Sequence, residues 1–230
     1  MITWGVFLNF SLPHLYGVGL VAVAQLVEPQ FVELVVAGSS PVGHPQSMSA
    51  INFSTQLLNI NSWTILHLPI DASAQLPSRG MIMVKGTMNG VPFKTLLEPD
   101  GVYGPGLKPS HWFRPDEQLL KEAHATVGDM VEISLEPTKE WIEPEVPEDL
   151  KKALASSPKA HELWEDITPM ARWDWIRWVR AVKTEDTRKK HLDVMLDKLN
   201  KGMKRPCCFN RNMCSEPHVS KNWALLMPTI

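Results

Sequence analysis

The pattern of apolar and polar positions divides the chain into a first part with strand character and a second part with helical character. Between residues 51 and 70, short runs of β-branched and aromatic residues end at Asn, Ser or Pro, which is typical of strands. Asn89-Gly90 lies between two further extended runs and suits the positive φ angles of a type I′ turn, so we expect a hairpin there. Residues 127–135 begin with a Gly-Asp turn and alternate apolar and polar positions as a last strand. Several short strands joined by turns predict a small β-barrel or sandwich, and we favour the closed barrel.

Helix starts follow an acidic, proline-rich connector at residues 137–146. Pro147 suits the first turn of a helix, and Ser157-Pro158 restarts it. Thr168-Pro169 and Thr184 begin the next two helices in the same way. Apolar residues recur at the spacing of a buried helical stripe at Trp175, Ile176, Val179 and Val182. The whole pattern predicts an α+β fold, in which a small closed β-barrel is followed by a three-helix segment.

Composition refines this picture only slightly. The 230 residues are 44% apolar and 21% charged, as in ordinary globular proteins. The net charge of −2 gives no global attraction to nucleic acid or anionic membranes. The 3 cysteines are an odd number with two adjacent, which does not suggest a disulfide framework and favours a cytoplasmic protein. We expect five segments: an extension (1–47), the barrel (48–136), a linker (137–146), the helical segment (147–203) and a tail that contains the cysteines (204–230).

The extension at residues 1–47 has an unusual sequence, since the first Lys or Arg of the chain is Arg79. No positive charge precedes its apolar run, as a secretory signal requires, and the run at residues 17–27 is shorter than the about 20 residues of a membrane span. Residues 21–45 resemble the conceptual translation of a bacterial transfer-RNA gene. On this hypothesis translation begins at Met48, and the extension has no packed partner. The rival is a genuine apolar extension or membrane anchor, although we expect no membrane span.

Two stretches of the predicted barrel resemble a known domain. The text GTMNGVPF at residues 86–93 is followed some 35 residues later by GDMVEI at residues 128–133. This arrangement is similar to an uncharacterised bacterial small-barrel domain of unknown function, over roughly residues 52–136. The segment KPSHWFRPD at residues 108–116 departs from the plainer pattern of that domain.

The helical segment resembles the YdeI/OmpD-associated family, also called bacteriocin-protection proteins. The matching text is PEDLKKALASSPKAHELWEDITP followed by WIRWVRAVKTEDTRKKH, within residues 147–203. Lys183, Thr187 and Arg188 match the family's Ala-Lys-x-x-Glu-Thr-Arg core, whereas Asp186 stands where Glu is usual. The resemblance implies a link to envelope stress or to protection from antibacterial agents, and it implies no established activity.

A first candidate site lies on a predicted Gly/Pro-rich loop before the predicted helix at residues 116–124. An aromatic and basic cluster there could stack on a ligand ring or contact a phosphate, and its members are Tyr103, His111, Trp112 and Arg114. In the alternative interpretation, Trp112 and Phe113 plug one end of the barrel, while His111 and Arg114 are solvated.

A second candidate site is a cationic face on the last two helices. It would consist of Trp173, Arg177, Arg180, Lys183 and Arg188, and it would suit an anionic partner. Acidic residues interrupt this face at Asp186, Asp193 and Asp197. Because of them, an ordinary solvated helix face is the favoured alternative, and the nucleic-acid signal is weak.

The tail offers a third, weaker cluster, made of Cys207, Cys208, Cys214 and His218. Thiolates and imidazole bind zinc, but adjacent cysteines do not have the spacing of a zinc knuckle. Nearby Arg205 and Arg211 could instead lower a thiol pKa and make it redox-reactive. The favoured alternative is a tail with incidental thiols whose Phe209 packs on the barrel, and we expect neither a metal nor a cofactor.

Catalytic motifs are missing from the sequence, since it contains no nucleophile elbow, P-loop, dinucleotide fingerprint or HExxH. Glu98 and Asp100 lie near the end of the hairpin without a partner that the sequence identifies. We therefore expect a non-enzymatic binding or stress-protection module that binds a protein partner or itself. The alternative is a ligand-binding barrel, or an enzyme, with its site near residues 103–114. A barrel interior filled by apolar residues would favour the non-enzymatic module. We expect this interior to contain Ile65, Val84, Phe93, Leu96, Val131 and Ile133.

Overall fold

The computed structural model describes residues 49–102, 104–207 and 209–228. The hypothesis about residues 1–47 lies outside these residues, as do Tyr103 and Cys208. Within them, no helix is long and apolar enough to cross a membrane.

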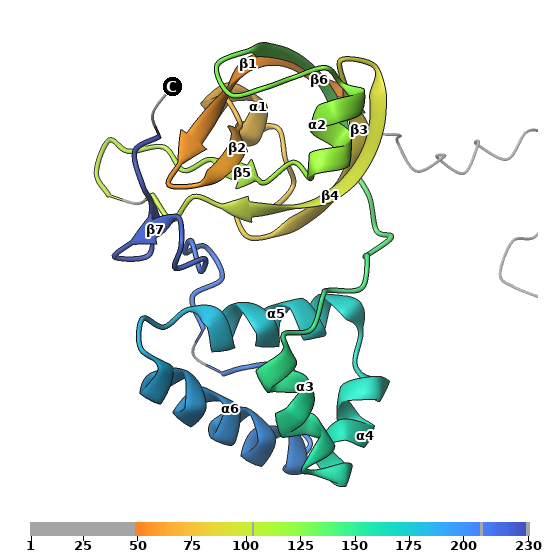
Figure 1. Ribbon diagram of the computed structural model, residues 1–230, viewed down its shortest axis with the longest axis vertical. Coiled ribbons are helices and arrows are strands. Elements are labelled where there is room, and N and C mark those ends of the chain that lie inside the picture. Colours follow the sequence, from red (N-terminus) through yellow and green to blue (C-terminus); the bar gives the residue numbers. More distant parts are fainter. Residues whose placement is uncertain (1–48, 103, 208, 229–230) are drawn as a thin grey trace, which may run out of the picture. The chain divides into compact units, whose positions relative to one another are not determined.

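The first part of the chain forms a closed barrel, as predicted (Figure 1). The strands of the described barrel are β1 (Ile51–Ile60), β2 (Trp63–His67), β3 (Ile82–Met88), β4 (Val91–Pro99), β5 (His111–Phe113) and β6 (Met130–Pro137). Their order around the barrel is β1-β2-β5-β4-β3-β6, and every neighbouring pair is antiparallel. The barrel closes because β1 pairs with β2 through its second half and with β6 through its first half.

Alternate residues of the strands fill the barrel interior with apolar side chains. The interior residues of β3, β4 and β6 include Ile82, Val84, Met88, Phe93, Leu97, Val131, Ile133 and Leu135. Two residues expected inside, Ile65 and Leu96, instead belong to clusters on the outer face of the barrel. Because side chains alternate between the two faces of a strand, Leu96 points outward and its neighbour Leu97 points inward.

Local signals in the sequence explain the turns and helices around the barrel. Asn89 and Gly90 have φ angles of 49° and 82°, so the predicted hairpin between β3 and β4 is confirmed. The helix α2 (Glu117–Glu122) begins where Asp116 accepts a hydrogen bond from the Leu119 amide. A further short helix, α1 (Ile70–Ala74), follows β2.

The second part of the chain is helical. Its helices are α3 (Glu148–Ala155), α4 (Pro158–Asp166), α5 (Pro169–Arg180) and α6 (Glu185–Asn200). The predicted break at Ser157 separates α3 from α4, so the predicted three-helix segment comprises four helices in the described chain. Thr168 and Thr184 cap α5 and α6 through hydrogen bonds from the amides of Ala171 and Thr187, as predicted.

The four helices enclose a core of their own. It contains Leu150, Leu154, Ala160, Trp164, Ile167, Ala171, Trp175, Ile176, Val179, Leu192, Met195 and Leu199. Trp175 is fully buried, as its position in the predicted stripe requires. Trp178 borders this core and stacks on the His191 ring, with 4.0 Å between the ring centroids. Val182 lies beyond the end of α5 and is only partly buried.

The tail after α6 returns to the outer face of the barrel. It includes the hairpin of β7 (Ser220–Lys221) and β8 (Ala224–Leu225). Cys214 and Val219 of the tail pack with Ile60, Ile65 and Trp112 of the barrel. The tail is thus part of the packed protein and carries apolar contacts of its own.

Candidate functional site

An apolar contact joins the outer face of the barrel to α5. The cluster contains Met81, Met83 and Leu96 from the barrel side, with Trp141, Ile142, Met170 and Trp173 packed against them. The Trp173 indole N–H donates to the Ile142 carbonyl oxygen at 3.0 Å. Trp173 is therefore half-buried against the connector, and part of its ring remains available to a neighbouring cleft.

Beside this contact, an ion network joins β4 to α5. The Arg177 Nε–H donates to Glu98 Oε2 at 3.3 Å, and Arg180 Nη2 donates to the other oxygen of Glu98. Ser215 Oγ accepts from both arginines, at 3.2 Å from Arg177 Nε and 3.2 Å from Arg180 Nη2. Arg180 also pairs with Glu216 of the tail at 3.4 Å. The network therefore links the barrel, α5 and the tail through side chains.

The prediction of an exposed cationic face on α5 is wrong for Arg177, which is 0% exposed. Besides Glu98 and Ser215, it donates to the Met213 carbonyl oxygen at 2.9 Å. A guanidinium can be buried in this way because it has five N–H donors and needs partners in several directions. Arg177 and Arg180 of α5 therefore mark a contact between this helix and the barrel.

The electrostatics of the network fix the charge of Glu98. Burial acts to raise the pKa of Glu98, but the charges of Arg180 and Arg177 outweigh it and hold the pKa below its usual value. Burial lowers the pKa of Arg177, yet an arginine stays protonated at neutral pH. Glu98 is therefore an ionised carboxylate at neutral pH, with no proton to exchange with a substrate.

A cleft of about 230 Å³ lies over this network, and we call it the Trp–Arg cleft. Its lining residues are Trp63, Thr95, Leu96, Glu98, Trp112, Phe113, Arg114, Ile142, Trp173, Arg180 and Glu216. At its edge, the Arg114 guanidinium lies 4.3 Å from the centroid of the Trp63 ring. The His218 ring lies 4.7 Å from the same tryptophan. An aromatic ring beside a cation suits an apolar or aromatic group that carries a negative charge.

Only part of the first predicted cluster reaches this cleft. His111, Trp112 and Phe113 form the strand β5 instead of a loop. Trp112 and Arg114 line the cleft, whereas His111 is buried on the other face of the strand. The His111 ring lies 2.8 Å from Ser73 Oγ and 3.0 Å from the Gly80 carbonyl oxygen, and burial lowers its pKa. His111 therefore stabilises the fold around α1 and is not available to a ligand.

The residues of the second predicted cluster do not form one site, because they lie in different parts of the structure. Trp173 and Arg180 line the Trp–Arg cleft, and Lys183 lines a different pocket beyond the end of α5. Arg188 donates to both carboxylate oxygens of Asp149, which attaches α6 to α3. A two-point guanidinium–carboxylate pair of this kind fixes the geometry of the two helices.

The cysteine cluster of the tail is not assembled into a site in the part of the chain that the structure describes. There, no group of three or more His, Cys, Asp or Glu side chains is arranged to hold a metal ion. Cys214 is fully buried, and burial raises its pKa to about 12, so the thiol is protonated and unreactive at neutral pH. Cys207 is exposed, with Lys198 Nζ at 3.0 Å from its sulfur.

The sequence gives no sign that Trp63, Ser215 and Glu216 belong to the cleft and its network, and it names Glu98 without identifying a partner for it. One signal for Glu98 existed in the alternation along β4. Leu97 points into the barrel, so Glu98 shares the outer face with Leu96, and both are buried. A carboxylate on an apolar outer face indicates a cationic partner on another element.

Comparison with known proteins gives a match for each half of the described chain. Residues 143–202 match the family model described as "Bacteriocin-protection, YdeI or OmpD-Associated". Residues 53–135 match the model described as "Domain of unknown function (DUF1905)". No curated protein matches the chain. Both resemblances seen in the sequence are confirmed: the barrel carries the pattern of DUF1905, and the helical segment carries that of the YdeI or OmpD-associated family.

Proposed function

We propose that the protein is a non-enzymatic binding module whose recognition surface is the Trp–Arg cleft. The observation that carries the proposal is the convergence on one cleft of Trp63 from β2, Trp173 from α5, and Trp112 and Arg114 from β5 and the residue that follows it. Aromatic residues and arginine dominate the energetics of protein recognition. Among the described residues, Arg114 forms no ion pair and stacks only on Trp63. Its charge is therefore available to a partner.

The carboxylates of the cleft support binding over catalysis. Glu98 is engaged by two arginines, and Glu216 pairs with Arg180. A general acid or base needs a pKa near the working pH, whereas that of Glu98 is lowered further from it. The alternative, a ligand-binding barrel or an enzyme with its site near residues 103–114, has less support. The barrel interior is filled by apolar side chains, and His111 is buried.

The partner that best fits the cleft is a protein segment with an aromatic or apolar side chain next to an acidic one. The apolar side chain would occupy the space between Trp63 and Trp173, and the acidic one would pair with Arg114. Because the helical segment matches a family named for bacteriocin protection, we further propose that this interaction takes place in the cytoplasm and protects the cell from such agents or from envelope stress.

Site-specific cross-linking tests the proposed surface. A photoreactive amino acid replaces Ile142, which lines the cleft and leaves Arg114 in place, and the control carries it at Lys121, which is exposed on α2 and does not line the cleft. We expect a discrete cross-linked protein at position 142 that is lost when Trp63→Ala or Arg114→Glu is added. The same product at both positions would contradict the proposal.

Survival of bacteria tests the proposed role. A strain that lacks the gene receives the wild-type chain or the double variant Trp63→Ala/Arg114→Glu, and both are exposed to a bacteriocin. We expect the wild-type chain to restore survival and the variant to fail at equal protein abundance. Equal survival with both chains would show that protection does not depend on the Trp–Arg cleft.

A further inference from the structure

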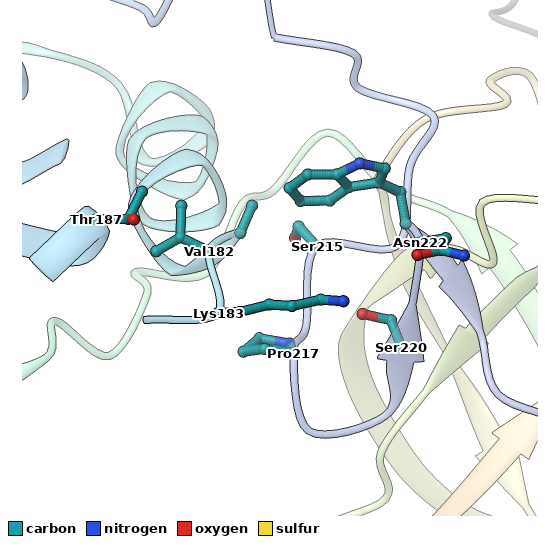
Figure 2. Close-up of a pocket in the computed structure, with 9 residues that line it drawn as sticks. Val182, Lys183, Thr187, Ser215, Pro217, Ser220 and Asn222 are labelled. Carbon is teal, nitrogen blue, oxygen red and sulfur yellow. The ribbon is translucent and has the colours of Figure 1, made fainter. Parts of the chain in front are cut away.

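A second pocket lies between the turn that joins α5 to α6 and the hairpin of the tail. It encloses about 300 Å³, which is at the lower end of the range for small-molecule sites. Val182, Pro217 and Trp223 supply apolar walls, and Ser215 connects it to the ion network beneath. Figure 2 shows the Lys183 side chain extended across this pocket towards Ser220 of the hairpin.

Lys183 gives the pocket one uncompensated positive charge. In the described chain, Lys183 takes part in no ion pair, and no Asp or Glu is among the residues that line the pocket. Glu216, which lies in the sequence between the lining residues Ser215 and Pro217, is already paired with Arg180. Asn222 adds an amide group at the hairpin side, and its side chain forms no hydrogen bond among the described residues. An anionic group in the pocket would therefore find a cation and an amide donor, neither of which has to leave another partner.

Trp223 lies in the pocket wall and has an unfavourable backbone conformation. Asn222 and Trp223 occupy the two central positions of the hairpin turn with φ angles of 52° and 67°. Such a turn favours glycine at its second central position, and a bulky residue with positive φ is uncommon. Trp223 is nevertheless 46% exposed, so burial of its ring does not explain its presence. Strained residues that persist in a fold often serve a binding site.

We propose that this pocket binds a small aromatic monocarboxylate. The carboxylate pairs with the Lys183 ammonium and accepts from the Asn222 amide, while the ring packs against the Trp223 indole and Pro217. A single cation among mostly apolar walls suits one negative charge, whereas a phosphate dianion would need more donors. This site is separate from the Trp–Arg cleft and does not depend on the function proposed for that cleft.

Calorimetric titration of the full chain with phenylacetate tests the proposal, with phenylacetamide as the neutral analogue and inorganic phosphate as the anion without a ring. We expect binding of phenylacetate that is at least tenfold tighter than that of either analogue. Lys183→Met and Trp223→Gly should each weaken it at least tenfold. Trp223→Gly relieves the strained φ angle, so its thermal midpoint should be equal to or above that of the wild type, and its loss of binding is not a loss of fold.

Two matched variants complete the experiment. Lys189→Met removes an exposed lysine of α6 that does not line the pocket, and Trp63→Ala removes a tryptophan of the other cleft. Both should bind phenylacetate as the wild type does. No binding of phenylacetate, equal binding of phenylacetamide, or unchanged binding by Lys183→Met would overturn the proposal. None of these results bears on the Trp–Arg cleft, whose test uses cross-linking at position 142.

Discussion

Glu98 is the residue on which the two halves of the described chain converge. It is buried at the end of β4, and the arginine partners that fix its charge lie 79 and 82 positions later in the sequence. The alternation along β4 indicates that Glu98 faces outward. No local sequence pattern identifies a partner that lies so far along the chain. The sequence therefore identifies Arg177 and Arg180 only as basic residues of a helix, and the assignment of Arg177 to an exposed face is wrong because Arg177 is buried.

Glu98→Gln should destabilise the protein strongly at neutral pH. It removes the counter-charge of two arginines, of which Arg177 is fully buried, and such a loss costs about 3–5 kcal/mol of unfolding free energy. The control Glu140→Gln removes an exposed partner of Lys94 and should cost far less, because solvent screens an exposed pair. Urea unfolding at pH 7 measures both values, and similar costs would contradict the assigned role of Glu98.

The pH dependence of this effect follows from the pKa of Glu98, which is lowered in the folded protein. A lowered folded-state pKa means that the stabilisation is complete above the unfolded-state pKa of about 4.3 and is lost as the pH falls through the folded-state value. The difference between wild type and Glu98→Gln should therefore persist from pH 7 to pH 5 and shrink in more acidic solution. A difference that is constant down to the acid limit would show that charge is not its cause.

Asp174 on α5 should behave in the opposite way. Its side chain is 0% exposed, and Arg205 and Arg211 approach within 3.6 and 3.4 Å without forming a hydrogen bond to it. Burial raises its pKa despite these charges, so ionisation of Asp174 costs stability in the folded state. The stability that this group contributes is complete below its unfolded-state pKa and is lost as the pH rises through the folded-state pKa.

Asp174→Asn is therefore expected to raise the thermal midpoint at pH 7, because it removes the ionisation of a buried carboxyl. The gain should decrease as the pH falls through the raised folded-state pKa of Asp174 towards the unfolded-state value of about 3.9. Thermal unfolding followed by circular dichroism across this range measures the trend. A variant that is less stable than the wild type at pH 7 would mean that the two arginines outweigh burial.

At the level of elements, sequence reasoning succeeds where the signal is local. The Thr168 and Thr184 caps and the Asn89-Gly90 hairpin are found where the sequence predicts them. Each depends on a few neighbouring residues whose side chains or φ angles determine the structure. The strand β5 was predicted as a loop because its three residues become a strand only by pairing with β2 and β4.

Gly101, just after β4, allows the tail to approach the barrel closely. A Cβ atom at this position would lie 1.8 Å from the Trp223 carbonyl oxygen and 2.7 Å from the Cys214 amide nitrogen. These two atoms form a hydrogen bond within the tail, at 2.8 Å, and the Leu225 amide of the tail donates to the Asp100 carbonyl oxygen beside Gly101 at 2.7 Å. Glycine is therefore required at position 101 for space as well as for its φ angle of 74°.

Gly101→Ala should destabilise the protein more than Gly106→Ala, which provides a matched control. Gly106 has a similar φ angle of 77°, but no atom lies within 4 Å of the place of its Cβ. Both variants incur the backbone strain of about 1–2 kcal/mol, and only Gly101→Ala also displaces the tail. Chemical unfolding of the two variants measures the difference. Equal losses would show that the close approach contributes nothing.

The whole molecule depends on contacts that the sequence does not reveal. The two family segments were predicted correctly because each has its own apolar core, one inside the barrel and one among the helices. For the tail, the sequence predicts at most a contact of Phe209 with the barrel, since its apolar residues have no period; the Phe209 ring instead lies 5.4 Å from the Arg177 guanidinium. In the structure the tail's backbone carbonyls at Arg211 and Met213 accept from Arg177, and Cys214 and Val219 pack on the barrel.

Deletion of residues 204–230 should therefore uncouple the two cores. Arg177 would lose its acceptors in the tail, and the outer face of the barrel would expose Ile60, Ile65 and Trp112. An unsatisfied buried donor costs about 1–3 kcal/mol, more when it is charged, so the contact between β4 and α5 weakens while each core stays closed. Scanning calorimetry should then show two thermal transitions, both below the single transition of the full chain.

A shorter deletion from Met227, whose side chain is 90% exposed, should keep a single transition. One cooperative transition after the longer deletion would mean that the apolar contact around Trp173 couples the cores without the tail.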